Sequence, residues 1–76
     1  MGYKMTIFQT SDLALAAYMI TKGLKLSKAE RLKSGRYHFE IEDPNDIADK
    51  LKVEFINSEF IKFDNNLKML KKMMYA

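Results

Sequence analysis

Residues 33–42, KSGRYHFEIE, decide the fold, because they hold a turn followed by the clearest alternation in the chain. Tyr37, Phe39 and Ile41 fall on one face of a strand, and the polar residues between them fall on the other. The Gly-bearing segment Lys33–Arg36 has the composition of a hairpin turn. The stretch therefore predicts the second arm of an antiparallel hairpin with one face on a core.

The first arm, residues 24–32, is less regular. Leu24, Leu26 and Leu32 share a face with Lys28 and Glu30, so we expect this arm to bulge or to lie at a sheet edge. In a regular strand, the cations at 25, 31 and 33 and the serine at 27 would share one face.

A short strand is predicted at Tyr3–Phe8, followed by a helix that Thr10 caps, with Asp12 in its first turn. That helix should run to Lys22 and end at Gly23, which tolerates the left-handed conformation of a helix end.

The first helix is apolar on nearly all sides. One stripe, which we expect to face the core, is formed by Leu13, Ala16, Ala17, Ile20 and Leu24; the opposite side carries Leu15, Tyr18 and Met19. Such a helix is normally buried all round. Either it is a central helix wrapped by the chain, or a second subunit covers Leu15, Tyr18 and Met19 in a homodimer.

Two helices are predicted after the hairpin. Asp43 and Pro44 read as the cap and first position of a helix whose apolar stripe is Ile47, Ala48, Leu51 and Phe55. After a break at residues 57–59, Phe63, Leu67, Leu70 and Met74 recur on one face of a last helix, as a core stripe would. The order β-α-β-β-α-α predicts one α+β domain over residues 1–76, an antiparallel sheet packed on helices.

Composition excludes several classes of protein. The 76 residues are 47% hydrophobic and 30% charged, with 0 Cys, so neither a disulfide framework nor a thiolate metal site can form. The longest apolar run, Leu13–Ile20, is far shorter than the roughly 20 residues of a membrane span. We expect a cytoplasmic protein with no membrane partner.

Residue types for catalysis are scarce. The sole histidine, His38, lies on the polar face of a strand, where we expect it to be solvated, and the serines have no nucleophile-elbow context. The acids between Glu40 and Asp49 read as strand and capping charges rather than as a cation site. The sequence predicts no enzyme, no catalytic residues, no cofactor and no metal.

Charge is arranged in blocks. Residues 22–36 hold six cations against Glu30 alone, a net charge of +5, within a total of +3. A basic hairpin can follow a phosphate backbone with salt-dependent affinity. The candidate nucleic-acid-binding residues are Lys25, Lys28, Arg31, Lys33 and Arg36.

The end of the last helix is rich in methionine, which adapts to protein partners. Met69 lies off the apolar stripe, so Met69, Met73 and Tyr75 are candidate partner-binding residues.

The run from Phe8 to Tyr18, FQTSDLALAAY, resembles the opening of an uncharacterised family of small domains from Gram-positive bacteria and their phages. The closing strand Phe39–Asp43, the pair Leu70-Lys71 and Tyr75 are similar to later elements of that family. The resemblance implies a phage or mobile-element setting and no known substrate.

Two functions therefore stay open for a non-enzymatic binding protein. The first is nucleic-acid association through the basic hairpin. The alternative is a protein-binding inhibitor or adaptor, for example of the anti-defence or anti-CRISPR type.

Overall fold

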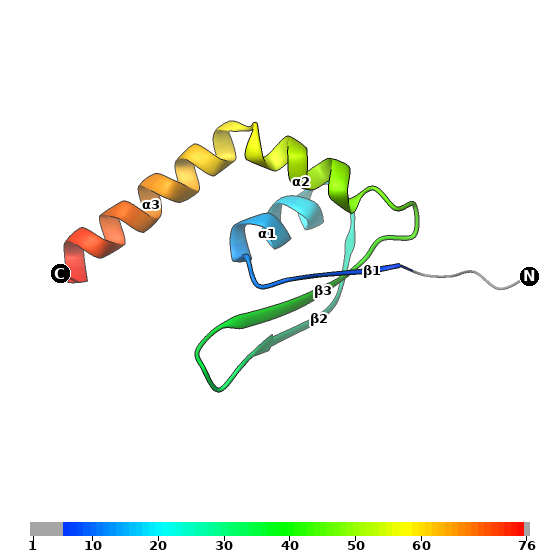
Figure 1. Cartoon of the computed structure of the whole chain (residues 1–76), viewed down its shortest axis with the longest axis horizontal. Helices are drawn as coiled ribbons and strands as arrows, with labels where there is room; N and C mark the ends of the chain where they lie inside the picture. Colours follow the sequence, from blue (N-terminus) through cyan, green and yellow to red (C-terminus); the bar gives the residue numbers. More distant parts are fainter. Residues whose placement is uncertain (1–5, 76) are drawn as a thin grey trace, which may run out of the picture.

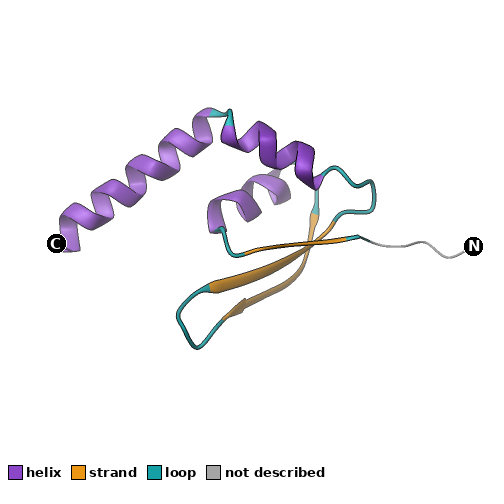
Figure 2. Cartoon of the chain, viewed as in Figure 1, coloured by secondary structure: helices purple, strands orange, loops and turns teal. Residues whose placement is uncertain are grey.

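The computed structural model describes residues 6–75 and confirms the predicted α+β order (Figure 1). Figure 2 shows the three strands on one side of the chain and the helices on the other. The elements are β1 (Ile7–Thr10), α1 (Leu13–Thr21), β2 (Lys25–Arg31), β3 (Tyr37–Glu42), α2 (Ala48–Ile56) and α3 (Glu59–Tyr75). Residues 3–5 of the predicted first strand lie outside the described residues.

The three strands form an antiparallel sheet in the order β1-β3-β2. The central strand is β3, whose Phe39 and Ile41 are buried as the alternation predicted. The first arm of the hairpin is an edge strand, and its pairing shifts between Leu26 and Lys28. Both expected irregularities of that arm, a bulge and an edge position, are confirmed.

The core lies between the inner face of this sheet and the helices α1 and α2. Its buried apolar residues are Leu15, Ala16, Tyr18, Met19, Phe39, Ile41, Ala48, Leu51 and Phe55. The stripe that we expected to face the core was wrong for α1, because Leu13, Ala17 and Ile20 are exposed. Both sides of α1 are apolar, so the sheet and α2, rather than the periodicity, decide which side is covered.

The ends of α1 are fixed by local hydrogen bonds. Asp12, and not Thr10, is the N-cap: its Oδ1 accepts from the Leu15 amide at 3.1 Å, while the Thr10 hydroxyl accepts from the Asp12 amide. At the other end Gly23 has φ of 104°, and the Leu24 amide donates to the Met19 carbonyl at 3.1 Å. This is the glycine-ended helix that the sequence predicted.

The start of α2 differs from the prediction. Pro44 lies in a turn, and the helix begins at Ala48. The side chain of Asp43 is buried, and its two oxygens accept from the amides of Ile47 at 2.8 Å and Ala48 at 2.9 Å. Asp43 therefore caps the helix as expected, but across a turn in which Asp46 adopts φ of 54°.

The last helix, α3, leaves the body of the molecule after a short break at residues 57–58 (Figure 1). All seventeen of its residues are described, and none of them is buried. Phe63, Leu67, Leu70 and Met74 therefore do not form the core stripe that the sequence predicted. Across residues 6–75, no helix has the combination of length and hydropathy that a bilayer crossing requires.

Candidate functional site

The cations of the hairpin do not share one face. Lys25 lies opposite Glu42 and Lys28 opposite Glu40, on the outer face of the sheet. After the bulge the parity changes, so that Arg31 lies opposite Tyr37, on the same side as the buried Phe39. The expectation that residues 25, 27, 31 and 33 share a face was therefore wrong.

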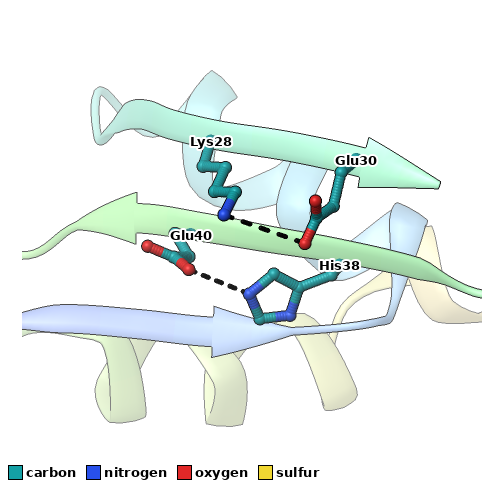
Figure 3. Close-up of polar contacts among 4 residues, drawn as sticks. All are labelled: Lys28, Glu30, His38 and Glu40. Carbon is teal, nitrogen blue, oxygen red and sulfur yellow. Dashed lines mark hydrogen bonds and ion pairs between the residues drawn. The ribbon is translucent and has the colours of Figure 1, made fainter. Parts of the chain in front are cut away.

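The outer face of the sheet mixes both signs of charge. Lys28 Nζ lies 3.8 Å from Glu30 Oε1, and His38 Nε2 lies 3.0 Å from Glu40 Oε2; Figure 3 shows both pairs. His38 thus has a carboxylate partner on its own strand rather than the purely solvated position expected for it. The remaining hairpin cations, Lys33 and Arg36, are exposed at the turn.

The residues proposed for self-association lie inside the chain's own core. Leu15, Tyr18 and Met19 are all buried, with Met19 0% exposed. Tyr18 packs on Phe55 with ring centroids 5.4 Å apart and donates a 3.3 Å hydrogen bond to Glu54. The apolar side of α1 that remains open is the opposite one, which carries Leu13 and Ile20.

The methionine-rich end of α3 is exposed. Met69, Met73 and Tyr75 all present most of their side chains to solvent. A larger apolar surface accompanies them on the same helix. Its five residues, which we call the α3 seam, are Phe60, Phe63, Leu67, Leu70 and Met74.

An apolar groove of about 290 Å³ runs between the first part of α3 and the open side of α1. Its walls include Leu13 and Ala17 from α1 and Phe60, Phe63 and Leu67 from α3. Tyr18 also lines the groove, with its ring 5.6 Å from that of Phe60 in an edge-to-face contact. Four of the five seam residues were recognised in the sequence as an apolar stripe but were assigned to the core. The fifth, Phe60, was not recognised.

Charged side chains border this groove. Asp64 lies within it, and a neighbouring depression is lined by Asp64, Lys68 and Lys71. Lys68 Nζ is 2.9 Å from Asp64 Oδ2, and this hydrogen-bonded contact raises the pKa of Lys68 above 10.5. On the other side Leu13 also borders a depression with Arg31 and Tyr37 of the hairpin. The groove is lined mainly by apolar side chains, with Asp64 as its charged lining residue, and further charged residues line the two neighbouring depressions.

This arrangement suits burial of an apolar partner surface. Within residues 6–75, no three histidine or carboxylate side chains lie close enough together to hold a metal ion. The polar side chains that line the groove are few, namely Tyr18, Thr21 and Asp64. An apolar centre with a polar rim is the usual anatomy of a protein interface.

The fold and the groove together define a small α+β domain with an unfilled apolar surface. The chain belongs to the family described as domain of unknown function DUF5659, whose model matches residues 5–76. No curated protein and no solved structure matches it. The predicted membership of an uncharacterised family of small domains is confirmed, whereas the phage or Gram-positive setting stays a prediction.

Proposed function

We propose that this chain is a non-enzymatic protein-binding module that holds its partner in the groove and along the α3 seam. The observation that carries the proposal is the state of α3: a seventeen-residue helix has a continuous apolar stripe, yet none of these described residues is buried. Helices of globular domains normally cover such a stripe, because packing supplies most of their stability.

The exposed side chains of the α3 seam can still gain free energy by being buried. Burying a large apolar side chain is worth about 1.5–3 kcal/mol relative to leaving it exposed. In the isolated chain part of this free energy stays unused in all five seam residues, whose exposed fractions run from 40% for Leu67 to 79% for Met74. Contiguous exposed patches of this kind usually mark interaction sites.

The sheet offers less to a nucleic acid than the sequence suggested. Lys25 and Lys28 face Glu42 and Glu40, so their charge is offset on the surface they share. Phosphate tracking depends on unneutralised cations, which leaves mainly the exposed tip of the hairpin. A protein ligand is therefore the better-supported choice, and a role as an inhibitor or adaptor in a mobile-element setting fits it.

Site-specific photo-crosslinking in expressing cells tests the proposal. A photoreactive phenylalanine analogue at Phe63, in the groove, should form adducts with polypeptide. The matched control carries the same analogue at Gln9, an exposed residue of β1 that pairs with Glu40 on the outer face of the sheet. We expect polypeptide adducts from position 63 and few from position 9.

Two outcomes would overturn the proposal. One is equal labelling of polypeptide from both positions, which reports random encounters. The other combines two results. An analogue placed at Tyr37, near the hairpin tip, forms adducts with nucleic acid and none with polypeptide, while the analogue at position 63 forms no adducts. That second pattern would instead support the nucleic-acid alternative.

A further inference from the structure

We infer that the occupant of this surface is the α3 helix of a second copy of the chain, lying antiparallel to the first. The inference rests on the proposed function, because it names the partner of the same surface. Three features of the molecule support it: the spacing of the α3 seam, the distribution of charge along α3 and the position of the groove.

The seam has the spacing of a coiled coil. Phe60, Phe63, Leu67, Leu70 and Met74 are separated by 3, 4, 3 and 4 residues, the a and d positions of a heptad. Such a seam is the narrow apolar stripe by which one helix pairs with another of the same kind. A helix with this spacing is therefore complementary to a second copy of itself.

Charge decides the direction of the pair. The first half of α3 holds Glu59, Lys62 and Asp64, and the second half holds Lys68, Lys71 and Lys72. A parallel pair would bring Glu59 of one helix next to Asp64 of the other, since these occupy the g and e positions. An antiparallel pair brings the acidic half of each helix beside the basic half of the other and opposes the two helix dipoles.

A single antiparallel register joins these features. When Leu67 packs against Leu70 of the second copy, Phe63 packs against Met74 and Asp64 lies beside Lys71, each contact occurring twice. The aromatic-to-thioether contact at both ends is favourable for a methionine. Phe60 lies outside the paired segment, which agrees with its contact with Tyr18 in the same chain.

The groove has room for side chains of the second helix, such as the Met74 that this register places against Phe63. The first part of the seam already lines a wall of the groove, and Leu13 and Ala17 of α1 form the facing wall. Figure 1 shows the far end of α3 projecting clear of the other elements, so that a partner helix can reach Leu70 and Met74. Asp64 lies in the groove and Lys71 borders the neighbouring depression, on the side of α1.

The solution mass of matched charge variants tests the pairing. The wild-type chain should sediment as a concentration-dependent dimer of twice 8.9 kDa. Leu70→Glu places a charge in the seam and should abolish the dimer. Met69→Glu places the same charge one residue away, off the seam, and should keep it; the two side chains are 54% and 51% exposed, so neither substitution disturbs the core.

A charge exchange tests the direction. Lys71→Glu alone should weaken the dimer, because it places two acids together in the antiparallel pair. Adding Asp64→Lys to that variant should restore dimerisation. In a parallel pair, by contrast, Asp64→Lys alone would strengthen the association by relieving its contact with Glu59, a result that would overturn the antiparallel assignment.

The failure of this inference can be distinguished from failure of the proposed function. A wild-type chain that stays monomeric at high micromolar concentration overturns the self-pairing, as does equal loss of the dimer in Leu70→Glu and Met69→Glu. If crosslinks from position 63 to a different polypeptide persist in that case, the protein-binding function stands with another partner. If those crosslinks are also absent, both fail.

Discussion

The helices α1 and α3 carry apolar residues at similar helical spacing, but only one of them is covered. In α1 the buried side holds Leu15, Tyr18 and Met19, packed on the sheet and on α2. In α3 none of the seam residues is buried, although Phe60 contacts Tyr18 at the start of the helix, and all the residues of that helix are described. The periodicity thus indicates that a helix has an apolar side to bury. Which element packs on that side depends on the tertiary structure.

The size of the domain explains why one helix is left over. A short chain has few elements with which to cover apolar surface, and its core supplies only a few kcal/mol. The three-stranded sheet presents one inner face, which α1 and α2 occupy through the core. For α3 no further face of the sheet is available, because the outer one is charged.

The largest difference between the two regions should come from matched methionine substitutions. Met19→Ala should lower the free energy of unfolding by about 2–5 kcal/mol, because it leaves a cavity in a fully buried site. In a domain of this size that loss can unfold much of the population. Met73→Ala, on exposed α3, should change it by no more than about 0.5 kcal/mol.

Urea denaturation followed by circular dichroism, at a protein concentration low enough to exclude association, measures both variants. Equal losses of stability for Met19→Ala and Met73→Ala would show that α3 is packed in the monomer. That result would remove the distinction between the two helices.

A smaller difference in the free energy of unfolding is expected between substitutions of two acids at the start of α2. Asp43→Ala should cost about 1–3 kcal/mol, because it leaves the amides of Ile47 and Ala48 without their acceptor inside the protein. Asp49→Ala removes the same charge from the exposed first turn of that helix and should cost less than about 1 kcal/mol. Chemical denaturation of both variants measures the difference, and a larger loss for Asp49→Ala would contradict the capping role of Asp43.

Much of the fold was predictable because local signals agreed with the tertiary structure. The alternation of Tyr37, Phe39 and Ile41 identified the central strand, and Gly23 marked the end of α1. Even the irregular first arm signalled its edge position through Lys28 and Glu30 on the leucine side. In each case one short stretch contains the physical cause of the structure.

The candidate site was harder to predict because its causes lie between elements. One extra residue at the bulge, around Ser27, moves Arg31 to the opposite face from Lys25, and no local pattern shows where a bulge falls. The groove could not be predicted from the sequence, because it forms only where the beginning of α3 lies next to α1. The seam residues were recognised as apolar, but their spacing is equally suited to a core and to a partner helix.

The smallest expected effect concerns the ion pair of α3, which contrasts with the buried carboxylate of Asp43. The hydrogen bond and charge of Asp64 raise the pKa of Lys68 above 10.5, so Asp64→Asn should lower it toward that value. A raised lysine pKa contributes stability that is fully present below pH 10.5 and is lost as the pH rises through the folded-state pKa. Because Lys68 is well exposed, solvent screening keeps this contribution small.

Titration of the Lys68 side chain by NMR measures the shift directly, with Asp49→Asn on α2 as the control that should leave it unchanged. A wild-type Lys68 that titrates at 10.5, or a shift that survives Asp64→Asn, would mean that the pair does not form in solution.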